Sequence, residues 1–174
     1  MSLTVRLVEP SEFEALAQLG RETFYETWKD YNTAEDMQTY LAEAFDSAKI
    51  KKDLLNSSVN TFLFVLDLKT PVGYAKLRRD RTYDEFHGAQ VIEMERIYVK
   101  GEYQKQKAGK ALMDESLRIA RQEKHEWIWL GVNIDNHKAI QFYKNYGFEI
   151  FGSKMFKLGD AEDEDYLMKL KLSQ

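Results

Sequence analysis

The sequence contains no cysteine, which excludes disulfide bonds, thiolate metal ligands and a cysteine nucleophile together. Only 9 glycines and 2 prolines occur among 174 residues, which excludes a collagen-like chain or a proline-rich linker architecture. The longest uninterrupted apolar run, residues 62–66, is far shorter than the ~20 residues that a membrane-spanning helix needs. What is present, 44% hydrophobic and 31% charged side chains, is typical of a globular protein.

Positive charge is slightly scarcer than negative charge. Lys and Arg number 25 against 29 Asp and Glu, which gives a formal net charge of −4 at pH 7. This balance argues against binding along a phosphate backbone, and we expect neither a nucleic-acid nor a membrane partner. The charged N-terminal segment and the lack of cysteine predict a cytoplasmic protein without a signal peptide. The length predicts one domain over residues 1–174.

The spacing of apolar residues predicts an α+β chain. Ser11, with Glu14 three residues later, predicts a capping box at the start of the first helix. The informative feature is a strand, loop and helix over residues 91–123, followed by a strand and helix over 127–146. The expected strands cover 4–8, 62–66, 72–77, 91–99, 127–133, 148–158 and 165–172. The expected helices cover 13–28, 33–45, 47–56, 108–123 and 136–146, and an acidic turn covers 159–164.

A basic, polar loop over residues 100–107 runs into the helix that begins near Ala108. A helix N-terminus offers unpaired N–H groups and a positive dipole end, both of which stabilise a bound phosphate. Lys105, Lys107 and Lys110 add positive charge, and Gly109 permits a ligand to approach the backbone. From this segment alone, a phosphate site and an ordinary solvated basic loop are equally well supported.

Three motifs together carry a resemblance to a known family. They are Glu93-Met94-Glu95-Arg96-Ile97-Tyr98-Val99, Tyr103-Gln104-x-x-Lys107-x-Gly109 and Asn136-x-x-Ala139-x-x-x-Tyr143-x-x-x-Gly147-Phe148. With them, residues 91–152 resemble the GNAT acetyltransferase superfamily, and the segments Glu22-Thr23-Phe24 and Met37-Gln38-Thr39-Tyr40-Leu41 are similar to its bacterial PaiA-type polyamine N-acetyltransferases. The resemblance implies a GNAT-type α+β fold. Its mixed, mostly antiparallel sheet would have six to seven strands, helices on both faces and a splayed central strand pair.

The resemblance also implies acetyl-CoA as co-substrate and no metal. Loop backbone N–H groups would hold the pyrophosphate, the strand before the loop would pair with the pantetheine, and Asn136 would contact the pantetheine or cap its helix. Lys107 stands where a glycine is usual, which matters if that position needs a positive φ. The implied cofactor-binding residues are Ile97, Tyr98, Val99, Gln104, Lys105, Gln106, Lys107, Ala108, Gly109, Lys110, Asn136 and Tyr143.

Two glutamates and a tyrosine are the candidate catalytic residues. Glu93 and Glu95 lie two apart on a strand, so alternation places both on one face, which taken alone is typical of a solvated polar surface. Within the resemblance, one of them would relay the proton that an ammonium of pKa about 10.4 must lose. Glu95 matches the polyamine-acetylating pattern better, and Glu93 comes second. Tyr143 matches the family's general acid for the departing thiolate, with core packing beside Phe148 as the alternative.

The expected acceptor is a primary amine, and a polyamine such as spermidine or spermine is the first choice. Two alternatives stay open, a non-catalytic acyl-CoA-binding regulatory module and a protein or peptide N-acetyltransferase, and a homodimer is also left open. The three histidines His87, His125 and His137 lack metal-ligand spacing and are expected at the surface. Acidic side chains that would attract a polycation are Glu22, Glu26, Asp30, Glu35 and the run over 160–165.

Overall fold

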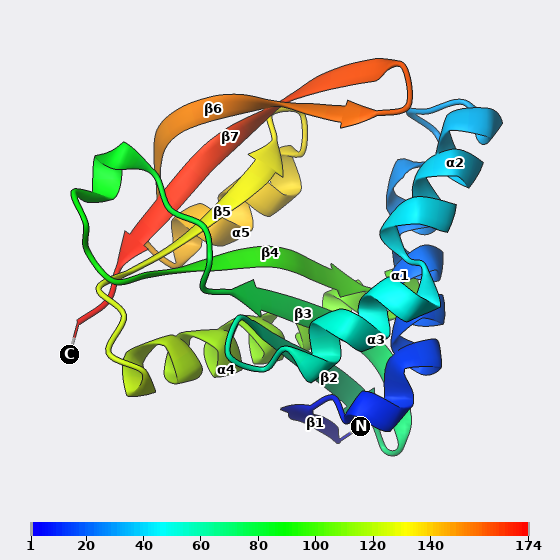
Figure 1. Ribbon diagram of the computed structural model, residues 1–174, viewed down its shortest axis with the longest axis horizontal. Coiled ribbons are helices and arrows are strands. Elements are labelled where there is room, and N and C mark those ends of the chain that lie inside the picture. Colours follow the sequence, from blue (N-terminus) through cyan, green and yellow to red (C-terminus); the bar gives the residue numbers. More distant parts are fainter. Residues whose placement is uncertain (1, 174) are drawn as a thin grey trace.

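A computed structural model describes residues 2–173, in which seven strands form one sheet of order β1-β2-β3-β4-β5-β7-β6 (Figure 1). Neighbouring strands are antiparallel except β4 and β5, which are parallel. The strands are β1 (Leu3–Leu7), β2 (Asn60–Asp67), β3 (Thr70–Arg78), β4 (Val91–Val99), β5 (Trp127–Asn133), β6 (Glu149–Leu158) and β7 (Ala161–Lys171). The α-helices are α1 (Phe13–Trp28), α2 (Ala34–Ala44), α3 (Ser47–Leu55), α4 (Ala108–Gln122) and α5 (His137–Asn145).

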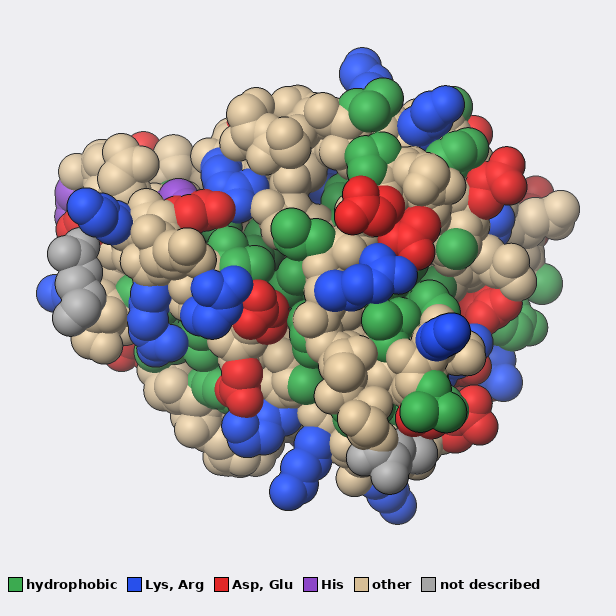
Figure 2. Space-filling model, turned by 90° about the horizontal axis from the view of Figure 1, so that it is seen from below, with side chains coloured by type: hydrophobic (Ala, Val, Ile, Leu, Met, Phe, Trp, Pro, Cys, Tyr) green, Lys and Arg blue, Asp and Glu red, His purple; other side chains and the backbone are tan. Residues whose placement is uncertain are grey.

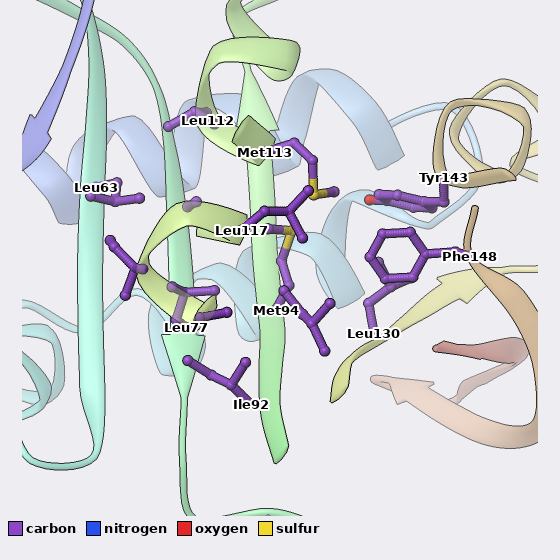
Figure 3. Close-up of a cluster of buried hydrophobic side chains, with 14 of the residues drawn as sticks. Leu63, Leu77, Ile92, Met94, Leu112, Met113, Leu117, Leu130, Tyr143 and Phe148 are labelled. Carbon is purple, nitrogen blue, oxygen red and sulfur yellow. The ribbon is translucent and has the colours of Figure 1, made fainter. Parts of the chain in front are cut away.

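Helices cover both faces of the sheet because its strands are apolar on both sides. On β2, Leu63 and Val65 pack toward α4 and α5, whereas Phe62 and Phe64 pack toward α1, α2 and α3. Figure 3 shows the first of these two cores, in which side chains of α4 lie between β3, β4 and α5. Burying a Leu, Val or Phe side chain contributes about 1.5–3 kcal/mol, so both layers hold the sheet in place. The predicted α+β fold with a mostly antiparallel sheet is confirmed.

The central strand pair separates, as the family resemblance implies. β4 and β5 pair from Val91 with Trp127 as far as Glu93 with Trp129, after which no paired residues follow in the described chain. The β6–β7 hairpin arches away from the sheet and reaches α2 (Figure 1). A Cβ placed on Gly159, at the hairpin tip, would overlap the Asp36 side chain at the start of α2. The separated strands and the arching hairpin together leave room for the site.

The predicted capping box at Ser11 is wrong. Ser11 lies inside a short 3₁₀ turn, η1 (Pro10–Glu12), and the backbone N–H of Glu9 donates to the Glu12 carboxylate at 2.9 Å. Proline is favoured at the first position of a helical turn, because its fixed φ suits that position and its missing N–H is not needed there. Pro10 therefore starts the turn earlier than the serine signal indicates.

The predicted extent of the acidic turn, residues 159–164, is also wrong. β7 begins at Ala161, so the connection consists of Gly159 and Asp160. Glu162 and Glu164 are exposed strand residues that alternate with less exposed neighbours. Acidic residues are rare in strands, and their exposed positions on this hairpin explain why the sequence favours a turn instead.

Surface features differ from the expectations in one respect. His125 is buried at 8% exposure, and its Nε2 lies 3.0 Å from the Glu123 carboxylate, so the expected surface position is wrong for this histidine. The reason is local, because His125 occupies the connection that turns from α4 into β5. On the face shown in Figure 2, Lys and Arg intermingle with Asp and Glu rather than forming a large area of one sign. Within residues 2–173, no helix is long and apolar enough to cross a bilayer, and the cytoplasmic location stays a prediction.

Candidate active site

Glu95 is an extra residue in the ladder between β3 and β4. Arg96 pairs with Lys76 across the ladder, and the next pair is Met94 with Leu77, so Glu95 has no partner residue on β3. Such a β-bulge breaks the alternation of side chains and leaves part of the backbone unpaired, which is why bulges are common next to active sites. The bulge therefore re-aims the side chains of β4 where β4 and β5 begin to separate.

The two candidate glutamates meet around one arginine. Nη1 of Arg81 lies 3.5 Å from a carboxylate oxygen of Glu93 and 3.7 Å from one of Glu95. Both glutamates also line the same cavity. They share one side of the strand as the alternation predicts, and the bulge follows, between Met94 and Arg96.

Glu95 is held by ion pairs. Its carboxylate lies 2.8 Å from Nζ of Lys76 and 3.4 Å from Nη1 of Arg78, and Lys76 also lies 2.8 Å from Asp53. Burial opposes ionisation of Glu95, but Lys76 and then Arg96 outweigh it, so the pKa of Glu95 is lowered. Glu95 is thus a carboxylate at neutral pH that lies in ion pairs with Lys76 and Arg78, a poor arrangement for taking up a proton.

Glu93 has the opposite environment. It is 2% exposed. Burial raises the pKa of Glu93, and the charge of Glu95 adds to the rise, although Arg81 and Lys154 oppose it. A carboxylate with a raised pKa in a cavity is suited to accept a proton near neutral pH. The structure therefore gives a physical reason to rank Glu93 ahead of Glu95, the reverse of the sequence ranking.

The N-terminus of α4 is open to the cavity. Its N-cap, Lys107, has a φ of +65° in the left-handed region, so this position does need a positive φ and costs a lysine about 1–2 kcal/mol. Lysine has no side-chain oxygen that could cap the helix, so the first-turn N–H groups stay available to an anion. A Cβ placed on Gly109 would meet nothing within 4 Å, which leaves space for a ligand against the backbone.

Basic side chains surround this helix end. The short helix η3 (Gly101–Gln106) leads into α4, and Nζ of Lys138 on α5 donates to the side chain of Gln104 at 3.3 Å. Four lysines line this end of the cavity: Lys105, Lys107, Lys110 and Lys138. Uncapped amides, open backbone and clustered lysines fit the diphosphate of coenzyme A, whose thioester arm would extend between β4 and β5.

Asn136 and Tyr143 lie at opposite ends of α5. Oδ1 of Asn136 accepts a hydrogen bond from the Ala139 N–H at 3.2 Å, so its predicted role as N-cap is confirmed. Tyr143 packs edge-on against Phe148 at 5.8 Å, and Figure 3 shows it extending from α5 toward α4 and β4. Burial raises the pKa of Tyr143 above its ordinary value, so its hydroxyl stays protonated and can donate. Tyr143 thus belongs both to the core and to the cavity wall.

One cavity of about 600 Å³ joins these groups. Gln106 and Ala108 are the predicted cofactor residues that do not line it. The Gln106 amide donates to the Glu102 carbonyl at 2.9 Å, and Ala108 is fully buried in the core. The predicted site residues that do line the cavity are Glu93, Glu95, Ile97, Tyr98, Val99, Gln104, Lys105, Lys107, Gly109, Lys110, Asn136 and Tyr143.

At the end of the cavity away from the N-terminus of α4, aromatic rings and side chains of the β6–β7 hairpin form the lining. Phe24 and Tyr40 stack with centroids 4.6 Å apart, and Tyr40 meets Phe156 of β6 at 6.0 Å. Asp163 and Asp165 on β7 line this end, as the acidic run predicts. The other acidic residues expected to attract a polycation do not line the cavity: Glu22, Glu26, Asp30 and Glu35.

Sequence reasoning missed four basic residues in and around the site. Arg81, Arg96 and Lys154 line the cavity, and Lys76 is 3% exposed beneath Glu95. A usable signal does exist at Lys76, because a lone lysine inside the apolar strand 72–77 must find a buried partner. Arg81 and Lys154 carry no such signal, because neither lies inside an apolar run of the sequence.

The sheet splays beside the N-terminus of α4, and carboxylates and a protonated tyrosine line the same cavity. Together these features are those of an acyl-CoA-dependent transferase. A model of the acetyltransferase (GNAT) family matches residues 13–148, and the chain belongs to this family. As a member of it, the protein is an acetyl-CoA-dependent N-acetyltransferase.

Relatives of full length accompany the family match. The chain is 31% identical over 175 residues to an uncharacterized N-acetyltransferase of Lactobacillus delbrueckii subsp. lactis, covering 97% of this chain and 98% of that protein. It is 25% identical to a spermidine N(1)-acetyltransferase of Thermoplasma acidophilum, with 98% of each covered. The solved structure of the PaiA N-acetyltransferase from Thermoplasma acidophilum, in complex with coenzyme A, superposes with a TM-score of 0.80 at 23% identity, covering 98% of this chain and 99% of that one. This last likeness supports the fold.

Proposed function

We propose that the protein transfers the acetyl group of acetyl-CoA to a primary amine of a small polyamine such as spermidine or spermine. The observation that carries this proposal is the single cavity, which joins the basic N-terminus of α4 to the carboxylates of β4 and β7. Acetyl-CoA supplies an activated acetyl thioester. The chain's own residues then bind the amine, remove its proton and protonate the leaving thiolate.

Two observations favour a polyamine over other amines. A relative of full length is a spermidine N(1)-acetyltransferase. In the cavity, Asp163 and Asp165 lie at the far end and Glu93 lies near the splayed strands, so separate ammonium groups of one linear molecule can each meet a carboxylate. Side chains of the β6–β7 hairpin line this end of the cavity, and its tip meets α2 at Asp36. This arrangement favours a small acceptor over a protein chain, which needs an open groove.

We assign the proton relay to Glu93 and a structural role to Glu95. Glu93 is buried with a raised pKa, so it can accept the ammonium proton, directly or through one water. Glu95, tied to Lys76, holds the bulge in place and adds negative charge. Tyr143 donates its hydroxyl proton toward the thiolate, and a backbone N–H of the stretch 97–99 polarises the thioester carbonyl.

The test is thiol release from acetyl-CoA with a panel of polyamines, amino acids, aminoglycosides and peptides with free N-termini. The proposal expects turnover with spermidine or spermine to exceed that with the other amines, with acetylated polyamine as product. Turnover confined to peptides would identify a protein or peptide N-acetyltransferase instead. Intact CoA binding without turnover of any amine would identify a regulatory module. Light scattering of the same preparation tests whether the protein is a homodimer.

A further inference from the structure

Arg96 is a largely buried arginine of the cavity wall. It lines the cavity, yet it forms no ion pair among residues 2–173, unlike Lys76, Arg78 and Arg81. Its Nη1 is shielded from solvent and forms no hydrogen bond within the described chain. Burial opposes the charge of Arg96, but nearby Tyr74 and Glu95 outweigh it, so the pKa of Arg96 is raised and the guanidinium stays charged. Largely buried cations that lack an ion pair are uncommon, and perturbed titratable groups concentrate at functional sites. A guanidinium inside a pocket for a cationic amine therefore needs an explanation.

Aromatic packing fixes the position of Arg96. Its guanidinium carbon lies 4.6 Å from the ring centroid of Phe45. The Phe45 ring occupies the space beside Gly20 on α1, where a Cβ would overlap it, and Arg21 donates to the Phe45 carbonyl at 2.6 Å. The guanidinium is thus held against the Phe45 ring at the wall of the cavity.

Other charged and titratable groups around Arg96 do not neutralise it one to one. Glu95 acts on it through space, but Glu95 already pairs with Lys76 and Arg78. Tyrosines stay neutral at physiological pH. The charged and titratable groups that share the main cavity with Arg96 are Tyr40, Arg81, Glu93, Glu95, Tyr98, Lys105, Lys107, Lys110, Lys138, Tyr143, Lys154, Asp163 and Asp165. On its other side, Tyr74 acts on Arg96, and a second cavity joins Arg96 to Glu43, Lys49, Lys52, Asp53, Lys76 and Arg78.

Resting on the proposed function, we propose that the positive charge of Arg96 makes the bound acceptor ammonium release its proton more readily. A neighbouring cation disfavours the charged form of an amine, as it does for catalytic lysines. The proton passes from the acceptor nitrogen to the Glu93 carboxylate. The freed lone pair attacks the thioester carbonyl, a C–N bond forms as the C–S bond breaks, and the Tyr143 hydroxyl protonates the leaving thiolate. Arg96 remains charged throughout.

The pH dependence of kcat, which reports ionisations of the enzyme–substrate complex, tests this proposal. At saturating acetyl-CoA and spermidine, Arg96→Met is expected to move the acidic limb of the kcat profile about one to two pH units upward. This size follows from Coulomb's law for two unit charges ~7 Å apart at an effective dielectric of about 20. Its kcat at pH 7 falls roughly tenfold or more and approaches the wild-type value at high pH, while KM for spermidine stays equal or falls. Arg96→Lys keeps the wild-type limb.

Arg118→Met is the matched control, because Arg118 on α4 is exposed and pairs with Glu115 at 2.7 Å. It should leave the pH profile unchanged. Replacing a buried unpaired charge by a methionine of similar size is often tolerated, and Arg96→Gln provides a second neutral variant. An unmoved acidic limb in both neutral variants overturns the proposal. A rise in KM with an unmoved limb would mean that Arg96 binds an anionic group of the acceptor.

Calorimetry supplies a readout that does not depend on turnover. Spermidine binding to the CoA complex at pH 7, measured in two buffers of different ionisation enthalpy, gives the number of protons released. The wild type is expected to release more protons than Arg96→Met. Equal release by both proteins overturns the role of Arg96 while leaving the proposed function intact. If spermidine neither binds nor turns over, the polyamine assignment falls, and the role of Arg96 falls with it.

Discussion

The ammonium of Lys76 lies 2.8 Å from the carboxylate of Glu95, beneath the bulge of β4. Lys76 is 3% exposed and approaches the Phe62 ring at 5.4 Å, so its ammonium depends on Glu95 and Asp53 as partners. Because Glu95 is the extra residue of the bulge, this ion pair ties the irregular backbone of β4 to the regular strand β3. The shape of the site thus depends on a contact outside the reacting groups.

Lys76→Met should destabilise the protein. Loss of Lys76 leaves the buried Glu95 carboxylate with only its longer contacts to Arg78 and Arg81. Removing one partner of a buried ion pair costs about 3–5 kcal/mol, and these remaining contacts place the expected loss at the lower end. Urea unfolding measures the loss. The control is Lys157→Met, which removes a lysine 73% exposed and 3.2 Å from Glu162, and it should change stability by less than about 1 kcal/mol. Equal effects of the two substitutions would contradict the structural role of Lys76.

Glu93→Gln should make the protein more stable at neutral pH and much less active. Burial raises the pKa of Glu93, so the folded state holds this proton more tightly than the unfolded state does. Wild-type stability therefore falls as pH rises from below the ordinary glutamate pKa through the raised folded value. The glutamine variant lacks this loss. Thermal unfolding between pH 4 and 8 checks the sign, and kcat should fall about 10²–10⁴-fold.

Glu95→Gln is the comparison for that experiment. The pKa of Glu95 is lowered, so its contribution to stability is present above the ordinary glutamate pKa and is lost as pH falls through the lower folded value. The variant should be less stable than the wild type at pH 7 and should lose less kcat than Glu93→Gln. A larger kcat loss at Glu95 would return the relay to the residue that the sequence ranks first.

Tyr143→Phe should lower kcat more than it lowers the affinity for CoA. The phenylalanine keeps the edge-on packing against Phe148 and removes only the hydroxyl proton. Steady-state kinetics and calorimetric titration with CoA separate the two effects, and a kcat loss of about 10²-fold or more is expected. Equal losses of turnover and CoA affinity would show that the tyrosine serves binding.

Gly109→Asp should weaken acetyl-CoA binding without unfolding the protein. A new side chain at Gly109 meets nothing within 4 Å, but its negative charge would face the bound diphosphate. We expect the CoA dissociation constant to rise at least about tenfold and the unfolding temperature to stay near that of the wild type. Gly109→Ala should do neither. Gly73→Ala is the contrasting case, because its Cβ would lie 2.7 Å from the Tyr98 carbonyl and should destabilise the sheet.

The sequence predicts the layout of this protein better than the details of its site. Helical spacing places α1 over Phe13–Trp28, and the start of α4 at Ala108 also follows from the sequence. The bulge at Glu95 leaves no pattern in a single strand, because it arises from the register of β4 against β3. The same limit hides Arg81, which reaches the glutamates from a connection with no regular spacing.

The end of the cavity that would bind the amine shows a second limit of prediction from sequence. Acidic residues of the first helix looked suitable by composition, yet Glu26 accepts a hydrogen bond from the Gly101 N–H at 3.0 Å and so supports the loop before α4. Which carboxylates line the cavity depends on the path of the β6–β7 hairpin, and that path is set by packing of its tip against α2. Tertiary contacts of this kind cannot be derived from local spacing.

A competition assay among amines tests the polyamine assignment in one experiment. Equimolar spermidine, spermine, an amino acid amide, an aminoglycoside and a peptide are incubated together with the enzyme and limiting acetyl-CoA, and mass spectrometry identifies the acetylated product. The product ratio gives the relative kcat/KM values without separate assays. The account predicts acetylated polyamine as the dominant product with the wild type and little product with Glu93→Gln. Dominant acetylation of the peptide or of the amino acid amide would contradict it.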